Sequence, residues 1–530
     1  MKITHRILSI LLALVPLATC AQGNSYTSNP MMRVIMDTYA SILRENPQDY
    51  ETYLNRAKEY YRYGDYSKAL SDLNEAIRYY PRQEASDLSQ AYTVRGLIYQ
   101  SQGDDMKALA DFNEALLLEP ESRFSLISRA DLLREMGDNM HAKEDYQLLL
   151  RRDTRCQEAY LGLGIIAHRE NNMGMCHDYM EKAMQANPTN VDFYITRAAI
   201  YEDMGEWRKA ANDYITAMTF GDNRRSVAGI NALSSIAYEP VVEALSVAID
   251  NAEDKGFYYF IRGSIHMNNQ HYSASIQDWN TIVDKKYLHF HSVYYNRGFC
   301  YMRLGQFDYA IEDVSTAIMM KGDQMPYYLT RSKLYRIMGQ YEQAMEDISV
   351  AATFDMTHKD VLAQRAMLAT EQRNYDEAIA YYNEAILNNA DEASLYLLRG
   401  DIYALLQDNE SALRNYRMIL NIHEHTPTFA SCQGFAMARM GRIEEAEAWM
   451  ESVMASIKGI PSPEDYYNAA CLYANTGNKT MAYQYLEKAL SAGYGDYFNL
   501  YFEYDTPISL ASLRNEADFR ELIKNFREVF

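Results

Sequence analysis

Arginine and aspartate recur along this chain at a fixed separation that suits ion pairing. Seven arginines are each followed by an aspartate sixteen residues later: Arg56 with Asp72, Arg95 with Asp111, Arg129 with Asp145, Arg197 with Asp213, Arg262 with Asp278, Arg297 with Asp313, and Arg331 with Asp347. A guanidinium and a carboxylate can form two parallel hydrogen bonds, which makes such a pair strong and specific. The spacing therefore predicts bidentate pairs between two elements of one structural unit. In an alternative interpretation, the arginines form a ladder that binds anions.

The two residue types also tend to be lost together. Where the arginine is replaced, an aromatic residue takes the place of the aspartate: Leu163 with Tyr179, Gln433 with Trp449, and Ala469 with Tyr485. Arg365 with Tyr381 and Arg399 with Asn415 are exceptions. Joint loss within one chain indicates that the two side chains touch, which favours the structural interpretation over the anion-binding one.

The elements that must position these pairs follow from a sequence pattern that repeats about every 34 residues. Its first part places apolar residues at helical spacing, as Tyr53, Ala57 and Tyr60 show. Gly64 then interrupts the helix. A second helical stripe follows, with Tyr66, Ala69, Leu73, Ala76 and Ile77. Each unit is therefore expected to be a helical hairpin, which buries its apolar face by stacking on its neighbours.

This pattern resembles the tetratricopeptide repeat. In the unit from Ser89 the matching residues are Tyr92, Arg95, Gly96, Tyr99, Gly103, Ala108, Phe112, Ala115 and Pro120. In the unit from His291 they are Tyr294, Arg297, Gly298, Tyr301, Gly305, Phe307, Ala310 and Ala317. Asn171 and Arg373 depart from it, because each replaces the glycine of the turn. The resemblance covers roughly Tyr50 to Gly493. It implies an all-α fold, a right-handed α-solenoid superhelix of stacked helix-turn-helix repeats, which binds proteins or peptides on its concave face.

The repeats and their interruptions divide the chain into segments. We predict a signal peptide over residues 1–21, a tail and capping helix over 22–49, a first array of five repeats over 50–224, a degenerate helical hairpin over 225–255, a second array over 256–458, a linker and last repeat over 459–497, and C-terminal capping helices over 498–530. The segment 225–255 lacks the usual tyrosine and glycine signals. It is interpreted either as a hinge in one stack or as a boundary between domains.

The first residues predict export from the cell interior. A basic start precedes an apolar run, Ile7 to Leu17, which is too short to span a bilayer, and small residues follow it. Cleavage after Ala21 would release a soluble chain into the periplasm. Alternatively, the residues ending at Cys20 resemble a bacterial lipobox, which would attach a lipid and hold the protein at the outer membrane. Thr19 is unfavourable directly before such a cysteine, so we expect the soluble form.

The tetratricopeptide resemblance also implies which side chains face the concave side. Relatives that clamp a partner's terminal carboxylate have Lys and Asn there, whereas the fifth position of most first helices here is apolar, so we expect no such clamp. Aromatic, Met and Leu side chains gather at these positions after residue 255: Phe257, Phe260, Met267, Tyr295, Phe299, Met302 and Leu329. They predict a groove for an apolar peptide. In the alternative interpretation, they pack between neighbouring helices as core.

Few residues suggest catalysis or metal binding. Two His-x-His pairs lie at repeat junctions without a third well-spaced ligand, so no metal site is expected. These pairs are His289 with His291 and His423 with His425. The run Gly162-Leu163-Gly164 lacks the strand context and the third glycine of a dinucleotide-binding motif. We predict no enzymatic activity and no cofactor.

Cysteine usage gives little evidence of disulfide pairing. Beyond Cys20, an odd number of widely spaced cysteines cannot pair completely within one chain: Cys156, Cys176, Cys300, Cys432 and Cys471. We expect them to be buried thiols, because several occupy positions that the repeat reserves for small residues. A bridge between Cys156 and Cys176 is an alternative.

Charge limits the classes of partner. The formal net charge is −21 over 530 residues, which makes nucleic acids and anionic membrane surfaces poor partners. No apolar segment after the signal is long enough to cross a bilayer. We therefore predict a non-enzymatic scaffold or adaptor of the bacterial cell envelope that binds other proteins or peptides. The alternative is a periplasmic, chaperone-like carrier of apolar client segments.

Overall fold

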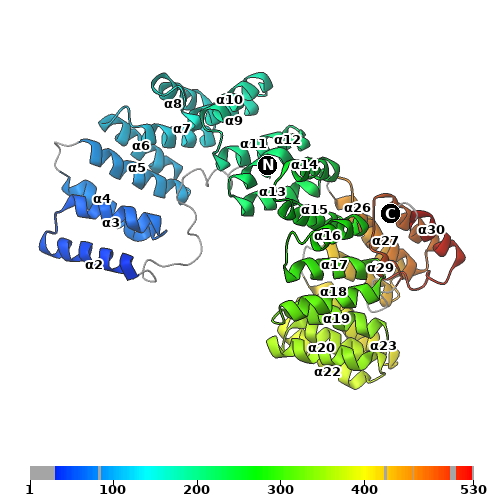
Figure 1. The fold of residues 1–530 in the computed structure, drawn as a ribbon. Helices are drawn as coiled ribbons and strands as arrows, with labels where there is room; N and C mark the ends of the chain where they lie inside the picture. The colour runs from blue at the N-terminus through cyan, green and yellow to red at the C-terminus, as the bar shows by residue number, and fades with distance from the viewer. Residues whose placement is uncertain (1–29, 81–84, 423–426, 458, 502–508, 528–530) are drawn as a thin grey trace. The chain divides into compact units, whose positions relative to one another are not determined.

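The computed structural model describes residues 30–80, 85–422, 427–457, 459–501 and 509–527, and these fold into α-helices joined by short turns (Figure 1). Among those residues there is no β-strand. None of the helices found there combines the length and apolar composition that a membrane-spanning helix needs. The predicted all-α fold of stacked hairpins is therefore confirmed. The predicted signal peptide and Cys20 lie outside the described residues.

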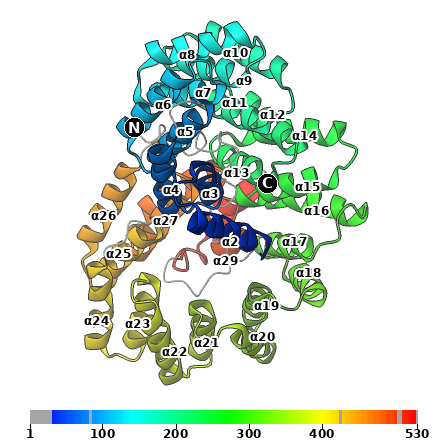
Figure 2. The same ribbon diagram turned by 90° about the vertical axis from the view of Figure 1, so that its left-hand side faces the viewer.

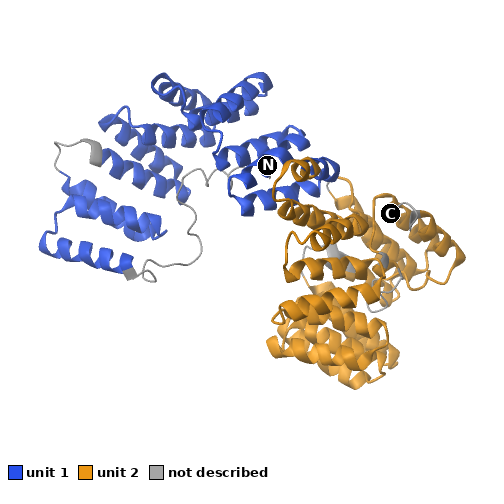
Figure 3. Ribbon diagram, viewed as in Figure 1, with its two compact units in different colours: residues 1–244 blue, residues 245–530 orange. Residues whose placement is uncertain are grey.

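The chain divides into two compact units, residues 1–244 and 245–530 (Figure 3). The division falls within α14 (Tyr238–Asn251), inside the segment 225–255 that lacks the repeat signals. That segment is helical, because it contains α14 and most of α13 (Asn223–Ser234).

From residue 30 on, where the description of this unit starts, α2 (Pro30–Glu45) packs on the first hairpin through its buried Met36 and Leu43. Five hairpins follow, which Figure 2 shows from a second side. They are α3 (Tyr50–Arg62) with α4 (Tyr66–Tyr79), α5 (Ala85–Ser101) with α6 (Asp105–Leu118), α7 (Arg123–Met136) with α8 (Asn139–Arg152), α9 (Gln157–Arg169) with α10 (Met173–Ala186), and α11 (Val191–Asp203) with α12 (Trp207–Thr219).

In the second unit, the described residues form seven hairpins and a C-terminal region. The hairpins are α15 (Gly256–Asn268) with α16 (Tyr272–Asp284), α17 (His291–Arg303) with α18 (Phe307–Met320), α19 (Met325–Ile337) with α20 (Tyr341–Phe354), α21 (Lys359–Glu371) with α22 (Tyr375–Asn388), α23 (Ala393–Leu405) with α24 (Asn409–Asn421), α25 (Pro427–Arg439) with α26 (Ile443–Ser456), and α27 (Pro463–Thr476) with α28 (Lys479–Ser491). Two further helices follow, α29 (Tyr497–Tyr501) and α30 (Ala517–Arg527).

The turn inside each hairpin named above contains a left-handed residue, and in several hairpins the next residue caps the second helix. Gly64 has φ 75°, and the next residue, Asp65, accepts a hydrogen bond from the backbone N–H of Lys68 at 3.2 Å, which caps α4. Asn171 and Arg373 keep the same backbone conformation, with φ 59° and 62°. The departures from the glycine pattern therefore preserve the turn, although a side chain there costs about 1–2 kcal/mol relative to glycine.

Two glycines that superficially suggest a nucleotide-binding loop instead allow helices to pack closely. Gly162 and Gly164 are both buried within α9. A Cβ atom at Gly162 would lie 2.2 Å from Cζ of Tyr146 on α8, and one at Gly164 would lie 2.6 Å from Cε of Met180 on α10. The absence of these side chains lets α8 and α10 approach α9.

The C-terminal region splits between two roles. Leu510, Leu513, Phe519 and Ile523 are buried in the core that also contains residues of α27 and α28, so these side chains pack with the last repeat. In contrast, α29 lies against α17, far from it in the sequence (Figure 1). The prediction of capping helices over 498–530 therefore omits this contact, because a helical stripe does not show which distant surface it meets.

Candidate binding surface of the second unit

The structure brings each predicted arginine and aspartate together. In all seven pairs Nε donates to one carboxylate oxygen and Nη2 to the other, at distances between 2.6 and 2.9 Å. The aspartates are buried, so the pairs join the two helices of a hairpin beneath the surface. Burial raises the pKa of Asp313, whereas its hydrogen bonds from Arg297 oppose that shift.

Most of these arginines also tie one repeat to the preceding one. Nη1 of Arg297 donates to Oδ1 of Asn280 on α16 at 2.9 Å, and Nη1 of Arg95 donates to Oδ1 of Asn74 on α4 at 2.8 Å. Three other pairs have an equivalent bond, to Asn113, Ser246 and Ser315. The guanidinium donors are thus used inside the protein, which favours a structural role over an anion-binding ladder.

The exceptional units replace the ion pair with weaker contacts at the same place. Nε of Arg399 donates to Oδ1 of Asn415 at 2.8 Å, and the guanidinium of Arg365 lies 5.7 Å from the ring centroid of Tyr381. Where the arginine is lost, Tyr485 stacks on Tyr473 with ring centroids 5.4 Å apart. In this unit the joint loss therefore changes the type of contact between the same two helices, α27 and α28.

The seven predicted groove residues lie on α15, α17 and α19, and we call them together the α15–α19 surface. Phe257, Phe260, Met267, Tyr295 and Phe299 are half-buried, whereas Met302 and Leu329 are buried with 4% and 7% of their surface exposed. Several of them also pack between helices.

Two aromatic residues of the α15–α19 surface pack against neighbouring helices. The ring of Phe260 meets Trp279 edge-on with centroids 5.2 Å apart, and Tyr295 stacks on Tyr327 at 4.3 Å. The interpretation as core therefore holds for part of this set. Met302 and Leu329 belong to the core, and the other five keep part of their surface accessible. Peptide binding by these residues stays a prediction.

A short segment of the chain itself lies on the α15–α19 surface. Nη1 of Arg303, at the end of α17, donates to the carboxylate of Asp496 and, at 3.2 Å, to Oδ1 of Asn499. Oε1 of Gln270 accepts a hydrogen bond from the backbone N–H of Gly495 at 3.1 Å. The segment 495–499 is therefore held by polar side chains that follow α15 and end α17.

Phe498 anchors the same segment through apolar contacts. It is fully buried in a cluster with Met302, Ala310 and Leu334, against which Phe299 also packs. Sequence reasoning missed Arg303, Gln270 and the segment 495–499. Arg303 follows Met302, the last residue of α17 that we expected on the concave face. The apolar pattern of the C-terminal tail, in turn, does not show that Asp496 contacts a residue 193 positions earlier.

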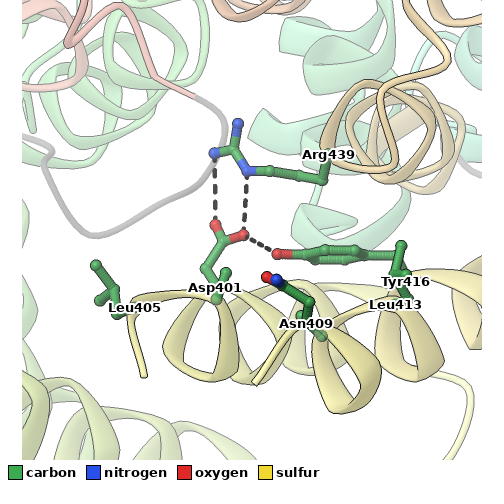
Figure 4. A pocket seen from close by; sticks show the side chains of 8 residues that line it. Asp401, Leu405, Asn409, Leu413, Tyr416 and Arg439 are labelled. Carbon is green, nitrogen blue, oxygen red and sulfur yellow. Dashed lines mark hydrogen bonds and ion pairs between the residues drawn. The ribbon is translucent and has the colours of Figure 1, made fainter. Parts of the chain in front are cut away.

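A second feature of this unit is a cavity of about 620 Å³ between α23, α24 and α25. Figure 4 shows that the Asp401 carboxylate lies between two donors, the Tyr416 hydroxyl at 2.7 Å and Nε of Arg439 at 3.0 Å. Burial and the charge of Asp401 raise the pKa of Tyr416, so its hydroxyl stays a donor. These three groups link three helices, and the cavity beside them is a second candidate site.

The structure also shows where the histidines considered as metal ligands lie. Within the described ranges, no cluster of three or more His, Cys, Asp or Glu side chains is arranged to hold a metal ion. Nδ1 of His291 lies 2.5 Å from the hydroxyl of Tyr327, and His423 and His425 lie outside these ranges.

Cys156 and Cys176 are free and buried, like the other three thiols after Cys20, so the alternative of a bridge between them is wrong. Both occupy packed core positions.

Comparisons with known proteins give the following matches. One family model described as tetratricopeptide repeat matches residues 127–174 and 364–423, and a second with the same description matches 89–122, 291–324 and 466–492. No curated protein matches the chain.

Solved structures similar to this chain include three that differ widely in length. A tetratricopeptide repeat protein from Parabacteroides merdae is 19% identical, over 54% of this chain and 98% of that one, with a TM-score of 0.28. Yeast Tom70 is 14% identical over 90% and 96% of the two chains, with a TM-score of 0.36. The APC/C hetero-tetramer Cut9-Hcn1 gives 13% identity over 91% and 99%, with a TM-score of 0.35.

The matched segments lie in both units, and they coincide with hairpins that the structure shows. The same hairpin, with its inter-helix ion pair and left-handed turn, recurs between the matched segments as well. This chain is a tetratricopeptide repeat protein.

Proposed function

We propose that this protein is a non-enzymatic scaffold or adaptor of the bacterial cell envelope, which binds partner proteins or peptides through the α15–α19 surface. Tetratricopeptide repeats serve protein and peptide binding, because stacked repeats offer an extended surface that no single globular core provides. The observation that carries the proposal is that this surface already holds a short segment, residues 495–499, by contacts that a partner peptide could also make.

The signal-like start of the sequence supports the envelope as location, because it predicts export. The net charge of −21 bears on the partner instead, since it disfavours nucleic acid. A carrier of apolar client segments is the alternative function. It would use the same half-buried aromatic side chains, so the two differ in the number and kind of partners that the surface binds.

Partner capture tests the binding function. We expect crosslinking of the tagged protein at native level in intact envelopes to capture a small set of stoichiometric partners. The double variant Phe260→Ser and Phe299→Ser should lose them, because both rings contribute exposed apolar area to the surface.

A matched control variant is Phe290→Ser with Tyr309→Ser, which changes two aromatic residues of the neighbouring region that are 55% and 60% exposed. This control should retain the partners. Circular dichroism must show that both variants keep their helices. Unchanged capture by a folded Phe260 and Phe299 variant would contradict the proposed surface, and a diffuse set of unfolded clients would support the carrier.

Processing of the N-terminus tests the location. We expect intact-mass analysis of protein purified from the envelope to show a chain that begins at Gln22. The physical reason is that small residues at Thr19 and Ala21 fit a signal-peptidase site. A mass that corresponds to a chain starting at a diacylglycerol-modified Cys20 would instead establish the lipid-anchored form.

A further inference from the structure

We propose that the α15–α19 surface recognises a peptide segment with an acidic residue two positions before a phenylalanine, and that residues 495–499 occupy this site in cis. A partner segment of the same chemistry would bind in competition with the chain's own segment. This inference rests on the proposed function, since it names the partner chemistry of the same surface.

The acidic residue is selected by Arg303. Its guanidinium contacts the Asp496 carboxylate, whose side chain is only 5% exposed, and the arginine side chain itself is 22% exposed. A charge-assisted hydrogen bond shielded from water is stronger and more specific than one at the surface. An uncharged residue in place of Asp496 would leave Arg303 partly buried without its counter-charge. The site therefore favours a carboxylate.

The aromatic residue is selected by cations and by shape. Nζ of Lys333 lies 4.7 Å from the ring centroid of Phe498, and the guanidinium of Arg303 lies 6.0 Å from it. The ring of Phe307 meets the same ring edge-on, at 6.1 Å and 85°. Cation–π and edge-to-face contacts both require a π-face, so an aliphatic side chain of similar volume would lose them.

The residue before the acidic one is restricted as well. The backbone N–H of Gly495 donates to Gln270, and a Cβ atom at Gly495 would lie 2.4 Å from the backbone oxygen of Gln270. Only glycine allows this approach without a shift of the backbone. The recognised pattern is thus Gly, then an acidic residue, then any residue, then Phe.

Competition follows from the connection of the segment to the rest of the unit. The Tyr467 hydroxyl donates to the backbone oxygen of Asn499 at 3.1 Å, and Nε of Arg514 donates to that of Leu500 at 3.0 Å. These bonds come from the last repeat and the C-terminal region, and they keep Asp496 and Phe498 close to α17. A tethered segment acts at an effective concentration on the order of millimolar, so a free peptide binds the native chain only weakly.

The experiment uses fluorescence anisotropy with a labelled peptide of residues 494–501 and the full chain. The variant Phe498→Ala removes the anchor of the internal segment and leaves Arg303, Lys333 and Gln270 unchanged. We expect it to bind the peptide at least about tenfold more tightly than the native chain, because a larger fraction of sites is open. Adding Arg303→Gln to this variant should abolish binding, and a peptide with Asn in place of Asp496 should bind at least about tenfold more weakly.

Other outcomes would overturn the proposal. A folded Phe498→Ala variant that binds no peptide, or binds the Asn peptide equally well, excludes this recognition. If that variant does not fold, Asp496→Asn keeps the packing of Phe498 and should show the same direction of change. Hydrogen exchange on the native chain gives an independent readout, since millimolar peptide should speed amide exchange at residues 494–500. Unchanged exchange there under saturating peptide would also exclude displacement.

The result is separable from the test of the proposed function. Envelope partners that depend on Phe260 and Phe299, together with failure of the peptide to bind, would refute only the acidic–aromatic recognition. Peptide binding with no envelope partners would refute only the scaffold function.

Discussion

Replacing Arg297 with methionine is expected to lower the free energy of unfolding of the second unit by about 3–5 kcal/mol. Arg297 donates two hydrogen bonds to Asp313 at 2.7 Å, and the side chains are 14% and 7% exposed. Removing the arginine leaves a buried carboxylate without its counter-charge and Asn280 without its donor. The loss should appear in urea unfolding and in faster amide exchange of the second unit, because a chain of two units need not unfold in one step.

A second substitution in the same background tests whether the pair is the cause. Once Arg297 is absent, Asp313→Leu should cause no further loss and should recover part of the stability, since it removes the unpaired buried charge. Losses that simply add would contradict the pairing.

The pH dependence has a definite sign. Burial already raises the pKa of Asp313, and loss of Arg297 raises it further. The folded pKa then lies above the unfolded one, so the stability that protonation supplies is present at low pH and is lost as the pH rises through the folded pKa. The difference between variant and native chain should therefore be smaller in mildly acidic buffer than at neutral pH.

Replacing Trp279 with alanine is also expected to lower the free energy of unfolding by about 3–5 kcal/mol, because it removes a large buried side chain. Trp279 is fully buried in a cluster with Ile276, Ile282 and Val293, and Phe260 meets its ring edge-on. The substitution leaves a cavity between α15 and α16 and removes the support of Phe260, so partner capture should weaken together with stability.

The matched control is Trp207→Ala in the first unit. Trp207 is half-buried on α12, so the same substitution removes fewer packing contacts. It should lower the free energy of unfolding by less than about 2 kcal/mol. Urea unfolding and hydrogen exchange should assign the Trp279 loss to the second unit and the Trp207 loss to the first. Equal losses at the two sites would contradict the role assigned to burial.

Features that depend on contacts within one repeat were predictable from the sequence. The pair Arg297 and Asp313 is an example, because both residues belong to one hairpin and a hairpin of fixed length sets their separation. The third hydrogen bond, from Arg297 to Asn280, was not predicted. Its acceptor lies on the preceding repeat and is Asn in some repeats and Ser in others, so no single residue type marks it.

The candidate site was predictable only in part. Phe260 and Phe299 were found because the repeat assigns their positions to one face of a first helix. Whether each is core or accessible depends on neighbours such as Trp279 and Phe498, and the sequence pattern does not contain that information. The buried state of Met302 and Leu329 is the clearest instance of this limit.

By itself the sequence determined that this protein is a stack of helical hairpins, that seven of these hairpins carry an arginine–aspartate pair, and at which repeat positions its aromatic residues gather. Repetition made this possible, since each local pattern recurs many times within one chain. Only the tertiary structure decided that Asp496 meets Arg303 and that Phe498 covers part of the aromatic face. Such contacts depend on small rotations between successive repeats, which accumulate over 193 residues and which no local pattern records.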